Sequence, residues 1–137
     1  MRGLLIFLWA AAIFIFTCTS NFDRLVQTGQ IQFHWSIHPS FANFFEPFPF
    51  LLDKSFLLQK MGHLTAFFIF TYLLQTKFHS KWLILSAAIS YAMLTECLQL
   101  FFSRDGRLFD IGIDLIGILL ASGLASFSRG SHVDNSV

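Results

Sequence analysis

Hydrophobic residues along the chain form four long runs that few charges interrupt. The first goes from Gly3 to Phe22 without a charged side chain. The interiors of the other three contain only Lys60, Glu96 and Asp114 as formally charged residues. A membrane span needs about 20 mostly apolar residues, because the hydrocarbon core of a bilayer is about 30 Å thick. The pattern therefore predicts four membrane-spanning helices, at residues 3–22, 55–78, 82–102 and 110–127.

The segment between the first two runs, residues 23–54, has a different composition. It contains several charged residues and all 3 prolines of the chain. Its apolar stretch 41–52 is too short and too rich in proline to span, and its aromatic residues favour the headgroup region of a bilayer. We therefore expect an all-α integral membrane protein, a four-helix bundle running up-down-up-down with one long loop after the first helix. Residues 1–137 form a single domain in this interpretation.

Composition supports a membrane protein and excludes several other classes. The chain is 55% hydrophobic and only 12% charged, whereas an average soluble domain carries roughly 25% charged residues. This balance excludes disorder and an ordinary soluble domain, and it makes the lipid bilayer the first expected partner. The net charge of +1 gives no basic patch for a nucleic acid. Cys18 and Cys97 stand in apolar runs without a CxxC pair, which argues against a disulfide framework or a zinc site.

The first run also has the length of a secretory signal peptide. Only Arg2 precedes it, and bulky residues stand at its end, so a retained span is favoured. Orientation depends on how the basic residues are counted, because the two sides hold similar numbers of them. If Lys60 and Arg104 belong to a site and leave that count, the positive-inside rule places the N-terminus in the cytoplasm.

Polar residues within the runs recur at helical spacing. Charged groups inside a span cost about 2.5 to 3.5 kcal/mol each, so their presence needs a reason. Residues three or four positions apart share one face of a helix. In an antiparallel bundle, the start of the second helix, the end of the third and the start of the fourth meet at one membrane face. The polar residues expected there are Lys60, His63, Glu96, Gln99, Asp110 and Asp114, with Arg104 on the adjoining turn.

The same residues carry a resemblance to a known family. The pattern Lys60-x-x-His63, then Glu96-x-x-Gln99, then Arg104-x-Gly106-x-x-x-Asp110-x-x-x-Asp114-x-x-Gly117 is similar to the signature of the VanZ-like membrane proteins. The likeness covers residues 55–125 and is weaker in the first helix, at Trp9 and Ser20. Two positions depart from it, because Phe102-Ser103 replaces the usual Pro-Gly and Ala121 replaces a second glycine.

The resemblance implies a multi-pass protein of the bacterial cytoplasmic membrane. The founding member of the family is linked to low-level resistance to teicoplanin, a glycopeptide that binds cell-wall precursors. A role in the cell envelope and in glycopeptide resistance is therefore what the resemblance implies for this chain, and it implies no particular reaction.

Two interpretations stand for each of the main polar residues. Glu96 is either a functional intramembrane carboxylate or the partner of Lys60 or Arg104 in an ion pair that fixes helix register. His63 is either a general base or a donor to Glu96. Arg104 either binds a phosphate or carboxylate, or pairs with Asp110.

The remaining polar and small residues have simpler expected roles. Gly117 is expected at a close helix contact, because small residues let membrane helices approach. Gln99 is expected to form a hydrogen bond across helices, and Arg107 to be a solvated charge of the turn. His63 and the three carboxylates are suitable metal ligands, but Lys60 and Arg104 would neutralise the same carboxylates, so no metal or other cofactor is expected.

Three functional hypotheses follow from these residues. The favoured one is a pocket that binds a cell-envelope molecule, such as a lipid-linked wall precursor, through Arg104 and Lys60. The second is an intramembrane enzyme with Glu96 or His63 as base, although the sequence shows no nucleophile motif. The third is an assembly or scaffold protein in which the charges only hold the bundle together. A proton-coupled transporter would need a dimer to enclose a path, and the sequence leaves the oligomeric state open.

Overall fold

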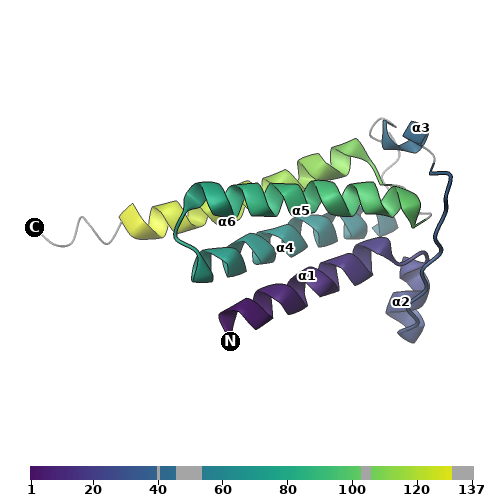
Figure 1. The fold of residues 1–137 in the computed structure, drawn as a ribbon, viewed down its shortest axis with the longest axis horizontal. Helices are drawn as coiled ribbons and strands as arrows, with labels where there is room; N and C mark the ends of the chain where they lie inside the picture. The colour runs from purple at the N-terminus through teal and green to yellow at the C-terminus, as the bar shows by residue number, and fades with distance from the viewer. Residues whose placement is uncertain (40, 46–53, 103–105, 131–137) are drawn as a thin grey trace, which may run out of the picture.

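Four long helices form the body of the protein (Figure 1). The structure is a computed structural model that describes residues 1–39, 41–45, 54–102 and 106–130. Within these ranges the helices are α1 (Arg2–Cys18), α2 (Phe22–Thr28), α3 (Phe41–Phe44), α4 (Lys54–Lys77), α5 (Lys81–Phe101) and α6 (Leu108–Gly130).

The long helices run side by side in alternating directions. Figure 1 shows α1, α4, α5 and α6 nearly parallel to the long axis, with the N-terminus and the last described turn of α6 at the same end. Three segments are long and apolar enough to cross a membrane, namely Phe56–Lys77, Lys81–Phe101 and Leu108–Ser126. α1 is a shorter apolar helix. The prediction of an all-α membrane bundle with four main helices is confirmed.

α1 ends four residues earlier than the run of hydrophobic residues suggests. Thr19 already has an extended backbone, at φ −66° and ψ 132°, so the helix stops at Cys18 rather than at Phe22. The side chain of Asn21 accepts a hydrogen bond from the Arg24 backbone N–H and begins the separate helix α2. Asparagine is a favoured N-cap residue, because its side chain satisfies a helix N–H that has no backbone partner.

The long connection between α1 and α4 lies across one end of the bundle, where Figure 1 places α2 and α3. Ser20 fixes its path by donating from its backbone to Gln32 and accepting at its hydroxyl from the His34 N–H. The Trp35 ring stacks on Phe101 at 5.4 Å between centroids and meets Phe102 edge-on. These contacts attach the connection to the end of α5. The interfacial segment predicted at 41–52 falls mostly outside the described residues.

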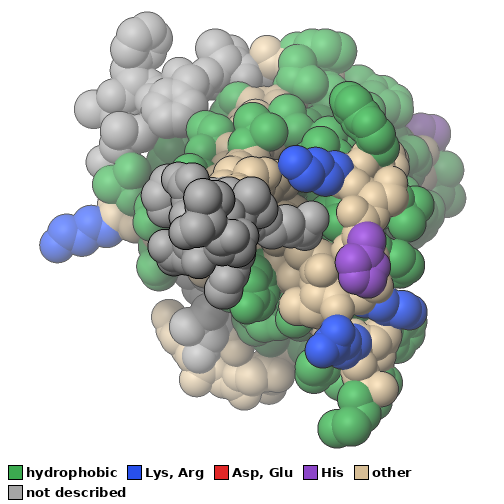
Figure 2. All heavy atoms as spheres, turned by 90° about the vertical axis from the view of Figure 1, so that its left-hand side faces the viewer, with side chains coloured by type: hydrophobic (Ala, Val, Ile, Leu, Met, Phe, Trp, Pro, Cys, Tyr) green, Lys and Arg blue, Asp and Glu red, His purple; other side chains and the backbone are tan. Residues whose placement is uncertain are grey.

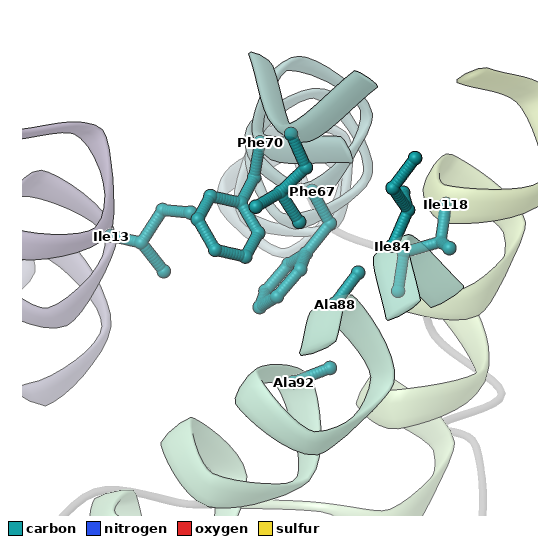
Figure 3. Packing of buried hydrophobic residues seen from close by; sticks show 8 residues of the cluster. Ile13, Phe67, Phe70, Ile84, Ala88, Ala92 and Ile118 are labelled. Atoms are coloured by element: carbon teal, nitrogen blue, oxygen red, sulfur yellow. The ribbon is translucent and has the colours of Figure 1, made fainter. Parts of the chain in front are cut away.

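The apolar core takes residues from all four long helices (Figure 3). Phe67 and Ala88 are fully buried, and Ile13 and Ile118 complete the contact from α1 and α6. Many other large hydrophobic side chains are exposed, including Leu4, Phe7 and Leu119 along the outside of the helices. A soluble domain rarely exposes so large an apolar surface, whereas a lipid bilayer covers it favourably.

The most extensive helix contact joins α4 and α6, which are not neighbours in the chain. Gly117 makes this approach close. A Cβ atom at position 117 would overlap the Leu64 carbonyl oxygen and lie 3.2 Å from the Phe68 backbone nitrogen. Ala121 is buried one turn later, and its carbonyl accepts a 3.3 Å hydrogen bond from the Gln75 side chain.

Candidate functional site

The structure brings six polar side chains together near one end of the bundle. Each is at most 9% exposed, although all of them carry polar or charged groups. α4, α5 and α6 contribute two residues each, and the positions lie within the first or last three turns of these helices. This set, called the polar cluster below, consists of Lys60, His63, Glu96, Gln99, Asp110 and Asp114.

Lys60 on α4 pairs with Asp110 on α6. The Lys60 Nζ lies 2.6 Å from Oδ1 and 2.7 Å from Oδ2 of that carboxylate. The same ammonium group lies over the rings of Phe56 and Phe109, at 4.8 and 4.9 Å from their centroids. Cation–π contacts of this kind help to hold a cation away from water. The suggested pairing of Lys60 with Glu96 is therefore wrong, because the rotation of α4 directs Lys60 toward α6.

His63 lies between two carboxylates. Its Nδ1 is 3.2 Å from Oδ1 of Asp114 and 3.5 Å from Oε1 of Glu96. The expectation that His63 meets Glu96 agrees with this geometry, but Asp114 on α6 is the nearer partner. Asp114 is fully buried, and within the described part of the chain its second oxygen, Oδ2, has no hydrogen-bond partner. His63 thus connects all three helices at the centre of the polar cluster.

Glu96 is held in place by two hydrogen bonds. Oε1 accepts from the Gln99 side chain at 2.7 Å, and Oε2 accepts from the Arg107 backbone N–H at 3.1 Å. The Gln99 bond is made within α5, three residues along the helix, and not across helices as the sequence suggested. Both bonds fix the orientation of a fully buried carboxylate.

Gly106 and Arg107, in the turn between α5 and α6, make contacts with Glu96 that the sequence did not predict. Gly106 is buried, and a Cβ atom there would overlap the Glu96 carbonyl oxygen. Only glycine lets the turn come this close, and that approach brings the Arg107 N–H to Glu96. The Arg107 guanidinium lies 5.8 Å from the centroid of the Phe109 ring. Arg107 is half-buried, so it is not the solvated charge that its place in a polar turn suggested. The predicted site residue Arg104 lies outside the described residues.

The described charges of the polar cluster form two groups. Lys60 is paired with Asp110, and His63 lies between Glu96 and Asp114. Lys60 is matched by Asp110 through both oxygens. The carboxylates of Glu96 and Asp114 therefore face His63 rather than Lys60.

An apolar cavity of about 280 Å³ lies between α1 and α4, beside the polar cluster. His63 is part of its wall, while most of the lining comes from apolar side chains such as Trp9, Ile13, Phe16 and Phe67. Trp9 also joins the two helices, because its ring N–H donates to the Ala66 carbonyl at 3.0 Å. The weak likeness to the family at Trp9 was one sequence signal for this contact, whereas no sequence signal predicted the cavity.

These features define a multi-pass membrane protein with a buried polar cluster that adjoins an apolar cavity. A family model of the VanZ/LLP1 proteins matches residues 3–129, and the chain belongs to this family. The chain is 37% identical over 125 residues to the uncharacterized membrane protein YwnJ of Bacillus subtilis (strain 168), covering 90% of this chain and 89% of that protein. No solved structure matches the chain significantly.

Proposed function

We propose that this protein binds a lipid-linked molecule of the bacterial cell envelope, and that this binding influences susceptibility to teicoplanin. The main support for this proposal is that His63 belongs both to the wall of the apolar cavity and to the buried polar cluster. An amphiphile has the same two parts, a chain and a polar headgroup. The chain takes the cavity between α1 and α4, and the headgroup lies toward His63.

The sequence suggested a headgroup contact through Arg104 and Lys60. Arg104 lies outside the described residues and stays a prediction, whereas the part through Lys60 changes. Lys60 is committed to Asp110 through both carboxylate oxygens, so it is not available as a free cation for a ligand. His63 takes that place in the proposal, because it is the member of the polar cluster that lines the cavity. The cavity is close to the lower end of the range of small-ligand pockets, roughly 300 Å³, so it accepts part of a chain rather than a whole lipid.

Filling the cavity tests lipid binding directly. Gly62 lines the cavity, and a Cβ atom there meets no other atom within 4 Å. Gly62→Leu therefore reduces the cavity while the backbone stays in place. A Cβ atom at Gly112 on α6 also meets no other atom within 4 Å, but Gly112 is not part of the cavity wall. Gly112→Leu is therefore the matched control.

Native mass spectrometry of the purified chain in detergent, with undecaprenyl phosphate or phosphatidylglycerol added, measures the bound lipid. We expect wild type and Gly112→Leu to retain lipid and Gly62→Leu to lose at least about tenfold in affinity, since tenfold corresponds to about 1.4 kcal/mol. Retention by all three chains would contradict the proposed cavity. A preference for one of the two lipids identifies the headgroup class.

The envelope role is tested in cells. A Gram-positive host without such genes carries empty vector, wild type or Glu96→Gln at matched membrane levels, and teicoplanin and vancomycin susceptibilities are measured. A selective rise in teicoplanin tolerance with wild type alone supports the proposal. No change with wild type at good expression would remove the envelope role. Loss of Glu96→Gln from the membrane would instead favour the scaffold hypothesis.

We infer the orientation from the two ends of the bundle. Figure 2 looks at the end where the chain begins, and among the described residues Lys, Arg and His side chains are visible there without a carboxylate. Arg2, Lys77 and Lys81 are exposed at this end. At the other end, Arg24 and Lys54 are exposed, whereas Lys60 is buried against Asp110. Exposed basic residues accumulate on the cytoplasmic side of membrane proteins, which favours a cytoplasmic N-terminus.

A further inference from the structure

We propose that His63, Glu96 and Asp114 bind a divalent transition-metal ion, Zn²⁺ or Mn²⁺, within the membrane-embedded part of the bundle. Each residue offers one ligand atom, and these three atoms lie within 4.8 Å of one another. All three side chains are buried and come from three different helices. The proposal goes beyond lipid binding and does not depend on it.

The spacing of the ligand atoms fits a metal. Zinc binds imidazole nitrogen and carboxylate oxygen at about 2.0 to 2.2 Å, which places neighbouring ligands of a tetrahedral centre about 3.3 to 3.6 Å apart. The Nδ1 of His63 is 3.2 Å from Asp114 Oδ1 and 3.5 Å from Glu96 Oε1. Two of the three distances between ligand atoms are therefore already close to the required length. The third distance, between the Glu96 and Asp114 oxygens, shortens when the two carboxylates rotate toward the metal.

A second, independent observation concerns Asp114. Its side chain is fully buried, and among the residues that the structure describes its Oδ2 has no hydrogen-bond partner. A buried carboxylate oxygen without a donor is costly, because burial removes the water that would otherwise solvate it. A metal ion beside Asp114 supplies the missing positive charge.

The objection drawn from the sequence named two cations, Lys60 and Arg104. Lys60 contacts Asp110 and not these three residues, and Arg104 lies outside the described residues. Glu96 is also oriented by Gln99 and by the Arg107 N–H, as ligating carboxylates usually are in metal sites. Asp110 and Lys60 then form a separate, internally neutral pair beside the metal.

Metal binding would also resolve the charge problem of an anionic headgroup. With His63 neutral, the carboxylates of Glu96 and Asp114 beside it repel a phosphate, whereas a bound divalent cation attracts one. This consequence rests on the proposed function, whereas metal binding itself is measured without lipid. The two can therefore fail separately.

The test uses the full chain without an affinity tag, purified in detergent and freed of metal with a chelator. Equilibrium dialysis against Zn²⁺ or Mn²⁺, followed by elemental analysis, gives metal per chain. We expect about one ion per chain for wild type and for His79→Ala, in which an exposed histidine is removed. His63→Ala and Asp114→Asn should each lose at least about tenfold in affinity.

A second measurement needs no variant and covers the case in which the substitutions unfold the bundle. X-ray absorption of the zinc-loaded wild type should show only nitrogen and oxygen ligands, with the scattering pattern of one imidazole. A folded wild type that binds no metal would overturn the proposal, and so would a sulfur ligand or equal binding by folded His63→Ala. In those cases a proton on the His63 Nδ1, shared with Asp114 and Glu96, takes the place proposed for the metal ion.

Discussion

His63 and Asp114 are 51 positions apart in the chain, yet Nδ1 of the first lies 3.2 Å from Oδ1 of the second inside the bundle. Removing His63 takes away the imidazole that lies between the buried carboxylates of Asp114 and Glu96. We expect His63→Ala to lower the free energy of unfolding by about 3 to 5 kcal/mol, the usual cost of an orphaned buried charge. Titration with SDS in mixed micelles measures it, and a loss no larger than that of the exposed-site variant His79→Ala would contradict this role.

The pair Lys60–Asp110 should behave as a coupled unit. Lys60→Met leaves a buried carboxylate unpaired, and Asp110→Asn leaves a buried ammonium group unpaired, so each should cost about 3 to 5 kcal/mol. The double variant removes both charges and should cost less than the sum by about 1 to 3 kcal/mol. The same SDS titration completes the cycle. Simple additivity would show that the two groups do not interact in the bilayer.

Gly117 should tolerate no side chain. The added methyl of Gly117→Ala meets the α4 backbone, so we expect a loss of about 1 to 3 kcal/mol through overpacking. Gly112 lies on the same helix, but a Cβ atom there meets no other atom within 4 Å. Gly112→Ala should therefore leave the protein's stability unchanged or raise it by up to about 1 kcal/mol through helix propensity. Equal effects of the two substitutions would mean that α4 and α6 do not approach closely.

Tyr91 should stabilise the contact between α1 and α5. The Tyr91 hydroxyl donates to the Ala10 carbonyl at 2.6 Å. Tyr91→Phe removes about 1 kcal/mol of stabilisation. In a Cys97→Ser background, labelling of the buried Cys18 thiol should then become roughly fivefold faster, because Cys18 reacts only when α1 detaches. Tyr72→Phe is the control, since Tyr72 is exposed, and an unchanged rate in Tyr91→Phe would exclude this attachment.

Cysteine labelling from outside the cell tests the proposed orientation. In a chain without its two native cysteines, Gln30→Cys in the long connection should react with an impermeant thiol reagent. His79→Cys, in the connection between α4 and α5, should react only after the membrane is opened. The reverse pattern would place the N-terminus outside.

Much of this architecture follows from spacing along the chain. Lys60, Glu96 and Asp110 sit near helix ends that an antiparallel bundle must bring to one side, so their meeting was predictable. Their partners were not, because the choice between Asp110 and Glu96 for Lys60 depends on the rotation of α4 about its axis. The Gly106 contact depends on the path of the turn, and the cavity depends on the position of α1 against α4. None of these is set by local sequence.

The long sequence separation of the polar pairs has a consequence for how the chain enters the membrane. Lys60 and His63 are synthesised about 50 positions before Asp110 and Asp114. When α4 reaches the translocon, its ammonium group has no counter-charge and opposes partitioning into lipid by about 2.5 to 3.5 kcal/mol. Release of α6 supplies the missing carboxylates. Biogenesis is therefore completed by the last helix, and a nascent chain that stops before Leu108 should remain at the insertion machinery or be degraded.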